Sequence, residues 1–570
     1  MPGSWVPLNN QPTFFAGTMF LLTDGTVMCQ DEGAGNPGTA NWWKLTPDGS
    51  GSYINGTWTQ LASGPNAPLY YASAVLQDGR VFIAGGEYNN GSSVDLSAAE
   101  IYDPVANSWT DIGTPGWAAI GDAPCAVLPD GRVLVGSIKD TRTAIYDPVA
   151  PGWTAGPNKH DSSSEETWTL LADATVLVAE CSAHPAAEKY VAASNSWVNA
   201  GSVPAGHDLV QSSAASTNEI GPAIAMPDGR VFAIGASGHN ALYIPPPIGN
   251  QPGTWQAAPD FPSSGGALME AFDAPAALLP NGKVLCIAGP RQADGWSGNP
   301  SHFFEFDGTS LAAVPDPPTA TGVETWQTRL LLLPTGEVMF TTGGQDIRVY
   351  QPDGSPDPFW KPSITSCPSY LQIGHSYILQ GRQLNGLSQA CSYGDDAGVA
   401  TNYPLVRIRN LASNHVFYCR THDHSTMAIN TGMVIHSTHF DVPAGIETGS
   451  SMLCVVANGI SSDCIPVNLG TKSFKDLKWE IKEIKDKDFI KDNQKTEIDV
   501  YKSLTSDFPK LKDSEGDPFR NFGDQQWQAI VRTLAERSDK IEALLQKRAF
   551  IKEEERPEVG GQALKKKDKS

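Results

Sequence analysis

The chain has 570 residues, with 55 glycines, 43 prolines and a formal charge of −22. Residues 471–570 carry 23 basic and 21 acidic side chains, which leaves the first 470 residues with 17 basic and 41 acidic ones. So acidic a body argues against nucleic acid as a partner and favours cationic or neutral partners. An acidic coat that serves only solubility is an equally good interpretation.

The chain shows no targeting or membrane segment. No apolar run approaches the roughly 18 residues of a membrane span, and the first residues lack the basic start and apolar stretch of a signal peptide. We therefore expect a cytoplasmic protein by default, with export by a signal-independent route as the alternative. The nine cysteines include no C-x-x-C pair, but one disulfide could form among the five cysteines from Cys367 to Cys464.

A hairpin pattern repeats along the first 363 residues. At residues 76–86, two apolar runs flank an Asp-Gly pair, which predicts a tight hairpin with a primed turn. The pattern returns every 43–55 residues, with the turn residues Asp24, Asp78, Asp130, Asp173, Asp228, Asn281 and Thr335. A period near 50 built of strands is typical of kelch β-propellers, and seven copies predict seven blades.

Most of the predicted blades end in an outer strand that carries a tryptophan. We expect these indoles to pack between neighbouring blades; they are Trp58, Trp109, Trp153, Trp197 and Trp255. The opening residues, Ser4 to Leu8, also read as an outer strand. We expect them to complete the last blade and so close the ring.

Two further segments follow the propeller predicted at 1–363. Residues 364–470 contain short strands without the repeat, which predicts an immunoglobulin-like β-sandwich. Residues 471–570 form a charged tail that is predicted to be mainly α-helical. An apolar stripe predicts a helix at residues 524–552, and that stripe needs a cover. Docking on this chain's own domains is one alternative. The other, which we favour, is a protein partner or self-association.

Residues 1–470 resemble galactose oxidase and its copper-radical relatives. The resemblance rests on the propeller followed by a sandwich, on the segment Arg420-Thr421-His422-Asp423-His424-Ser425, and on the last strands at 440–462. In that family a loop of the third domain brings a copper-ligand histidine into the propeller axis, and the segment at 420–425 looks like this loop. The family's centre needs copper, two tyrosines, two histidines and a cysteine cross-linked to one tyrosine.

The resemblance places the family's propeller ligands about eight residues before the turn residue. That offset gives Ala16, Tyr70, Asp122, Glu165, Ile220, Asp273 and Gln327. Tyr70 matches the cross-linked tyrosine and His422 the sandwich ligand, whereas Ala16 replaces the cysteine. Trp326-Gln327 replaces a Tyr-His pair, and Tyr88 occupies the position of the family's stacking tryptophan. Since one histidine and no thiol cannot build that centre, neither copper nor copper-radical oxidase activity is expected.

The offset leaves an acidic set, Asp122, Glu165 and Asp273, with His422 predicted above it. Three interpretations stay open: solvated channel-lining groups, a site for a cation or a polar ligand, and acid/base catalysis. Calcium or another divalent cation suits the carboxylates. His422 and His424, followed by His436 and His439, are candidate ligands of a transition metal, although histidines in strands are more often structural.

The predicted function is that of a non-oxidase relative of galactose oxidase that needs no cofactor. Its propeller mouth would recognise a glycan or a basic peptide through Tyr70, Asp122, Glu165, Asp273, Gln327 and His422, while the tail docks to a larger assembly. The alternative from the enzyme class is an acid/base or metal-assisted hydrolase or lyase that uses the mouth carboxylates and His422. A third hypothesis is a structural module with an inert mouth.

Overall fold

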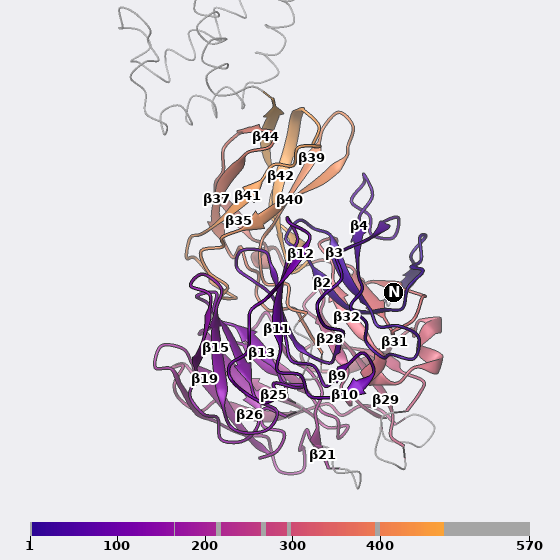
Figure 1. Cartoon of the computed structure of the whole chain (residues 1–570), viewed down its shortest axis with the longest axis vertical. Coiled ribbons are helices and arrows are strands. Elements are labelled where there is room, and N and C mark those ends of the chain that lie inside the picture. Colours follow the sequence, from indigo (N-terminus) through magenta and orange to yellow (C-terminus); the bar gives the residue numbers. More distant parts are fainter. Residues whose placement is uncertain are drawn as a thin grey trace, which may run out of the picture.

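The computed structural model describes residues 3–164, 166–212, 218–263, 269–292, 298–393 and 399–471. Within these ranges the chain is all-β, apart from three short 3-10 helices, η1 (Pro318–Gly322), η2 (Thr325–Gln327) and η3 (Pro358–Trp360). A large body of small sheets carries a C-terminal sheet at one end (Figure 1). None of the described helices is long and apolar enough to cross a membrane. The helix predicted at 524–552 lies outside the described residues.

The body consists of repeated antiparallel units of four strands. In chain order these are β2 (Ala16–Leu21), β3 (Val27–Asp31), β4 (Trp42–Thr46) and β5 (Thr57–Gln60); β7 (Ala72–Val75), β8 (Val81–Ala84), β11 (Ala99–Asp103) and β12 (Ser108–Asp111); β13 (Cys125–Val127), β14 (Val133–Gly136), β15 (Thr143–Asp147) and β16 (Gly152–Ala155); and β17 (Trp168–Leu170), β18 (Thr175–Ala179), β19 (Ala186–Val191) and β20 (Ser196–Ser202).

Three further units complete the body. They are β23 (Ala223–Ala225), β24 (Val231–Ile234), β25 (Asn240–Ile244) and β26 (Thr254–Ala258); β28 (Pro275–Leu278), β29 (Val284–Pro290), β30 (His302–Phe306) and β31 (Leu311–Val314); and β32 (Arg329–Leu332), β33 (Val338–Thr341) and β34 (Arg348–Gln351) with β1 (Ser4–Pro7). Short extra strands are β6 (Pro68–Leu69), β9 (Tyr88–Asn89), β10 (Ser92–Ser93), β21 (Gln211–Ser212), β22 (Asn218–Glu219) and β27 (Met269–Glu270).

The pairing of β1 with β34 confirms the prediction that the opening residues complete the last sheet. The outer-strand tryptophans also pack as predicted, between neighbouring sheets. Trp109 of β12 lies 5.4 Å from the ring of Trp42 on the preceding sheet and donates its indole N–H to the Ala62 carbonyl. Trp153 donates in the same way to Ile112, and Trp255 to Ala200. Each indole therefore fixes one sheet against the end of the one before it.

The hairpins form where the repeat predicts them, but the turn type was wrong. In the hairpin at Asp78 only Gly79 has a positive φ, of 85°, whereas a primed two-residue turn of the I′ type needs two such residues. The Leu76 N–H donates to the Arg80 carbonyl, and Oδ1 of Asp78 accepts from the Arg80 N–H at 3.0 Å. The aspartate thus caps a wider turn, in which glycine alone takes the left-handed position.

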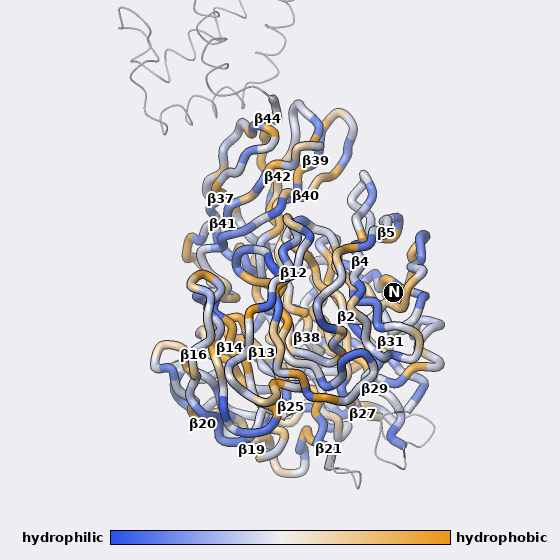
Figure 2. Tube along the Cα trace, viewed as in Figure 1, coloured by the Kyte–Doolittle hydropathy of each residue, from blue (hydrophilic) through white to orange (hydrophobic). Residues whose placement is uncertain are grey.

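The C-terminal segment forms one continuous sheet with a core of its own. Its strands are β35 (Ser363–Ser366), β36 (Tyr370–Gln372), β37 (Ser376–Arg382), β39 (Leu405–Asn410), β40 (Val416–His422), β41 (His436–Asp441), β42 (Gly449–Ala457), β43 (Ile460–Ser461) and β44 (Ile465–Gly470). Side chains such as Leu379, Ile408 and Phe440 are fully buried in it. The larger apolar core lies in the body, where hydrophobic residues follow the strands (Figure 2).

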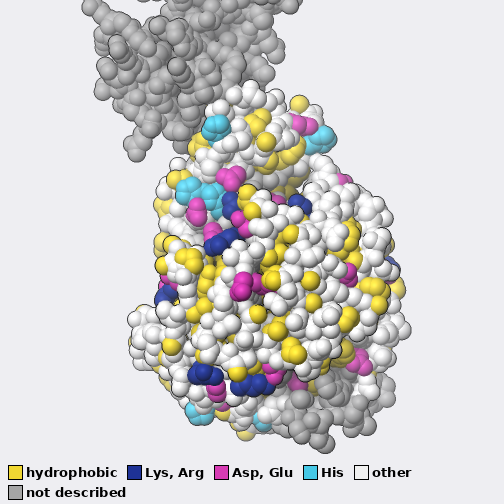
Figure 3. All heavy atoms as spheres, viewed as in Figure 1, with side chains coloured by type: hydrophobic (Ala, Val, Ile, Leu, Met, Phe, Trp, Pro, Cys, Tyr) yellow, Lys and Arg dark blue, Asp and Glu magenta, His cyan; other side chains and the backbone are white. Residues whose placement is uncertain are grey.

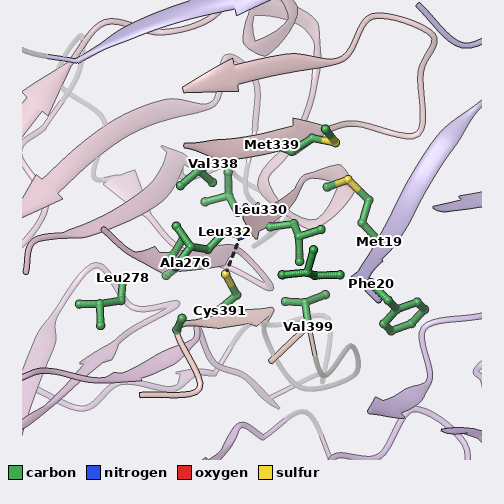
Figure 4. Close-up of a cluster of buried hydrophobic side chains, with 14 of the residues drawn as sticks. Met19, Phe20, Ala276, Leu278, Leu330, Leu332, Val338, Met339, Cys391 and Val399 are labelled. Atoms are coloured by element: carbon green, nitrogen blue, oxygen red, sulfur yellow. Dashed lines mark hydrogen bonds between the residues drawn. The ribbon is translucent and has the colours of Figure 1, made fainter. Parts of the chain in front are cut away.

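One strand of the C-terminal segment leaves this sheet and enters the body. β38 (Cys391–Tyr393) pairs with β28, the first strand of its unit, and also contacts β32 and β23. Figure 4 shows Cys391 among Leu330, Leu332 and Val399, with the Leu332 N–H donating to its sulfur at 3.1 Å. The segment around β38 therefore fills the space between the first strands β23, β28 and β32.

Candidate functional site

The hairpin turns of the body face the C-terminal sheet. Arg420 donates to the Asp78 carbonyl at 2.8 Å, and the Thr421 and Met427 N–H groups donate to the carbonyls of Thr23 and Pro129. Because strands in a hairpin run antiparallel, the segments that lead into the first strands lie at the opposite end of each sheet. We call that opposite end the connection end; it carries Tyr70, Asp122, Asp273, Trp326 and Gln327.

An aromatic cluster, made of Tyr70, Tyr88 and Trp326, occupies the connection end. The Tyr70 ring lies 6.1 Å from Tyr88 and 6.3 Å from Trp326, and both interplanar angles are 75°. All three side chains are half-buried. The cluster joins three of the positions that the family resemblance matched to its metal site and stacking residue.

Backbone hydrogen bonds place the aromatic cluster and the acidic candidates together. The Glu87 N–H donates to the Tyr70 carbonyl at 3.0 Å, and the Gly86 N–H donates to Gly121, next to Asp122, at 2.8 Å. On the other side, the Asp273 N–H donates to Ile220 at 3.3 Å. The hydroxyl of Thr325, in η2, donates to the Phe272 carbonyl at 2.5 Å. Asp273 and Trp326 therefore share the connection end with Asp122.

The acidic groups are close enough to affect one another and the tyrosine. Burial, the charge of Glu87 and the charge of Asp122 raise the pKa of Tyr88. Burial also raises the pKa of Glu87, where Asp95 and Glu219 add repulsion. Asp122 itself is buried, with 6% of its surface exposed. The cluster thus lies beside several carboxylates of one sign.

Glu270 is a strongly perturbed carboxyl at the connection end. Its side chain is fully buried in β27, and burial raises its pKa to about 8. The Arg291 guanidinium, 3.5 Å away, opposes this shift only in part. Within the described residues its two oxygens accept no hydrogen bond. At neutral pH this group therefore holds its proton most of the time.

A buried cation lies behind the aromatic cluster. Arg329, which is 1% exposed, lies 5.7 Å from the Tyr70 ring centre and donates to the carbonyls of Trp326 and Thr328 at 2.8 and 2.9 Å. Its charge lowers the pKa of the buried Glu32, although burial raises that pKa more. The sequence analysis missed Arg329. A charged residue at the start of the apolar run 329–333 was the signal that could have revealed it.

Two other polar side chains near the predicted level, Glu166 and Gln327, have partners of their own. Glu165 lies outside the described residues. Glu166 makes a buried ion pair with Lys159 at 2.9 Å, and Lys159 also contacts Asp161 and Glu180. The Gln327 side chain accepts from the Glu324 N–H at 3.0 Å, so it closes the short helix η2. Glu166 and Gln327 therefore serve local structure.

His422 lies at the other end of the body from the acidic candidates. It ends β40, beside the hairpin turns. The seven residue steps from Asp122 to Pro129, through the first strand β13, span roughly 20 Å at about 3.3 Å per residue, so Asp122 lies far from that end. The prediction that His422 lies above Asp122 and Asp273 was therefore wrong. The segment 420–425 does not reach the centre of the body; the segment around β38 does so instead.

The histidines of β40 and β41 form a small group at the hairpin end. His422 bonds Asp423 and Asp441 at 2.8 and 3.1 Å and stacks on His439 at 5.5 Å. Figure 3 shows histidine and acidic side chains gathered over this part of the C-terminal sheet. His422, Asp423 and His439 could hold a metal ion. His424 is not in that group, since it is buried, its Nδ1 pairs with Thr438, and burial lowers its pKa to about 3.

The donor set at the family's copper position does not fit a copper-radical centre. Ala16 is fully buried and its N–H donates to the Gly344 carbonyl, so neither thiol nor imidazole comes from that strand. Trp326 and Gln327 supply no imidazole either. Tyr70 is the one family-like donor among these residues.

Comparisons with known proteins agree with the repeat. The kelch motif matches residues 68–116, which run from β6 beyond β12 and include the hairpin at Asp78. The chain therefore contains a kelch motif, which supports the kelch-type family that the resemblance to galactose oxidase and its relatives predicted. The match supports the repeat and names no ligand. No curated protein matches this chain in sequence.

Three of the solved structures with some similarity to this chain are enzymes of two kinds. A fungal alcohol oxidase of the AA5 family in complex with copper is 14% identical, covers 82% of this chain and 100% of its own, and has a TM-score of 0.48. Virginiamycin B lyase from Staphylococcus aureus is 11% identical, covers 61% and 98%, and has a TM-score of 0.40. A catalytically inactive variant of that lyase with quinupristin has a TM-score of 0.43, at 10% identity and coverage of 61% and 99%.

Proposed function

We propose that the repeated four-strand units are the blades of one seven-bladed propeller, and that the C-terminal sheet is an immunoglobulin-like domain seated on its hairpin end. Contacts between first strands support the ring, since they link β7, β13, β17, β23, β28, β32 and β2 in that order. The packing of Trp109 against Trp42 joins the two remaining neighbours. In such a ring the connection end is the mouth.

We further propose that the mouth binds a polar, positively charged ligand such as a basic peptide. The observation that carries this proposal is the aromatic cluster beside Asp122 and Glu87. Aromatic faces attract cations through their quadrupole, and carboxylates attract them through charge. The acidic body adds a long-range field of the same sign.

A glycan is the other ligand class for the same groups. Carboxylates accept hydrogen bonds from hydroxyls, and half-buried rings stack on apolar sugar faces. Arg329 favours this class, because its guanidinium already lies over Tyr70 and repels a second cation there. The two ligand classes differ in charge. Added salt should therefore weaken the binding of a basic peptide and leave the binding of a neutral glycan nearly unchanged.

Acid/base catalysis is a second candidate function, and Glu270 favours it. A carboxyl with a pKa of about 8 can give up or take a proton near neutral pH. This version assigns no role to His422, which lies at the opposite end. If the wild type turns over a substrate and the Glu270→Gln variant does not, that result would support catalysis over binding alone.

The ligand class can be tested by thermal unfolding of the full chain. A lysine-rich peptide and a neutral oligosaccharide are each added at low and at high salt, because a ligand that binds the folded state raises Tm by mass action. We expect a rise with the peptide that shrinks at high salt and is lost in Asp122→Asn. The control is Asp463→Asn, which changes a 95% exposed side chain on the C-terminal segment. A rise with the oligosaccharide alone would identify the glycan class, and no rise with either would contradict binding at the mouth.

A further inference from the structure

A second cluster at the connection end contains two histidines and one aspartate. His207 follows a turn after β20, His239 precedes β25, and Asp260 comes two residues after β26. One ligand atom from each residue lies within 4.8 Å of the other two. Asp260 contacts both rings, with Oδ2 3.0 Å from Nδ1 of His239 and Oδ1 3.5 Å from Nδ1 of His207.

These contacts are not ordinary hydrogen bonds. Both Nδ1 atoms are buried, and within the described residues neither has a hydrogen-bond partner. Histidine–aspartate pairs nearby behave differently, since His184 bonds Asp208 at 2.5 Å and His302 bonds Asp316 at 2.8 Å. Two imidazole nitrogens and a carboxylate thus converge within contact distance but without hydrogen-bond geometry. Buried polar atoms without partners are rare and call for an explanation such as a bound ion.

The backbone holds the three loops together. The Phe261 N–H donates to the Gly238 carbonyl at 3.2 Å, and the Ser237 N–H donates to Leu209 at 3.2 Å. The Asn240 side chain donates to the Pro259 carbonyl at 2.8 Å. Each loop that carries a ligand is therefore bonded to the β24–β25 connection. Such support pre-organises a site before its ligand arrives.

We propose that His207, His239 and Asp260 bind a divalent transition metal ion of the class of zinc, nickel and iron(II). Imidazole nitrogens suit these borderline metals better than calcium or magnesium, which take oxygen ligands. Three protein ligands leave coordination positions open for water or a bound molecule. The exposed fractions of the three side chains, 31%, 37% and 41%, give solvent access to those positions.

The test is a calorimetric titration of the chelator-treated full chain with zinc chloride. We expect one ion to bind at this cluster, and His239→Ala to weaken that binding by at least the roughly 10–100-fold that loss of an outer-shell partner costs. Asp260→Asn, which keeps the shape of the side chain, should also weaken it. The matched control is His302→Ala, which removes a histidine from an ordinary pair and should leave binding unchanged.

Cobalt(II) absorption supplies a readout that misfolding does not imitate. We expect the ligand-field bands of bound cobalt(II) to change in Asp260→Asn while the thermal unfolding curve keeps its shape. Zinc affinity that stays unchanged in both His239→Ala and Asp260→Asn would overturn the proposal. So would zinc binding that only His439→Ala removes, because that result would assign the ion to the group at the hairpin end.

Discussion

The guanidinium of Arg329 lies 5.7 Å from the centre of the Tyr70 ring, at the point where the apolar first strand β32 begins. The same cation is buried near Glu32, and Thr18 joins the two by accepting from Arg329 through its hydroxyl and donating its N–H to Glu32. The aromatic cluster therefore lies in front of a buried arginine that Thr18 links to Glu32, so its position depends on the body behind it.

Arg329→Met should destabilise the chain strongly. Without this cation the buried Glu32 carboxyl loses its nearby countercharge and the carbonyls of Trp326 and Thr328 lose their donor, and buried groups left without a partner cost about 1–3 kcal/mol each. Urea unfolding measures the loss. The control is Arg142→Met, where a 46% exposed arginine pairs with Asp140 at the surface, and we expect a loss of about 1 kcal/mol or less. Equal losses in the two variants would contradict the role of Arg329.

The stability of the chain should carry a pH dependence from Glu270. Its pKa is raised from 4.5 to about 8 on folding, so the folded state binds more protons between these values. The stabilisation is therefore complete below about pH 4.5 and is lost as the pH rises through about 8. Glu270→Gln cannot ionise, so the free energy of unfolding of the wild type minus that of the variant should fall from pH 5 to pH 8.5 in urea unfolding. A value of this quantity that rises with pH would have the wrong sign.

Cys454 and Cys464 should form the one disulfide that the sequence left unassigned. Their sulfurs lie 2.6 Å apart, and the hydrogen bond from Cys464 together with Arg407 lowers the pKa of Cys454 to about 5. Cys464 is exposed to an oxidant. With glutathione disulfide, the two thiols lose two hydrogens and two glutathione molecules form. Peptide mass mapping should find this pair joined, and no such link in Cys464→Ser; a link between other cysteines would refute the assignment.

Local patterns predicted much of the fold. The hairpins, the tryptophan packing and the return of β1 to β34 each depend on neighbouring residues or on the repeat, and all three were predicted. The turn type was missed because the sequence Asp78-Gly79 suits both a two-residue turn and a wider one. The backbone conformation of the aspartate decides between them.

The candidate site was predicted less completely. The offset from the turn brought Tyr70, Asp122 and Asp273 to one end, because equal offsets in repeated units give equal heights. The resemblance of the segment 420–425 to the family's loop misplaced His422, since the β38 segment enters the body instead and its path leaves no periodic signal. The cluster of His207, His239 and Asp260 comes from three loops that the repeat does not place.

The charged tail remains a proposed docking arm. The predicted stripe at residues 524–552 needs a cover, and we propose that another chain supplies it. A chain that ends at Gly470 should keep the melting transition of the body and lose self-association or partner binding in sedimentation experiments. A full-length chain that sediments as a monomer and binds no partner would show that the tail does not dock.

Calorimetric titration with a lysine-rich peptide can separate the aromatic cluster from the general acidity of the body. Tyr88→Ala removes one ring of the cluster and keeps every charge, whereas Phe359→Ala removes an 89% exposed ring on η3. A cation–π contact contributes about 1–2 kcal/mol, so we expect Tyr88→Ala to weaken binding by roughly 5–30-fold and Phe359→Ala to leave it unchanged. Equal affinities of the wild type and Tyr88→Ala would contradict a ligand site at the mouth.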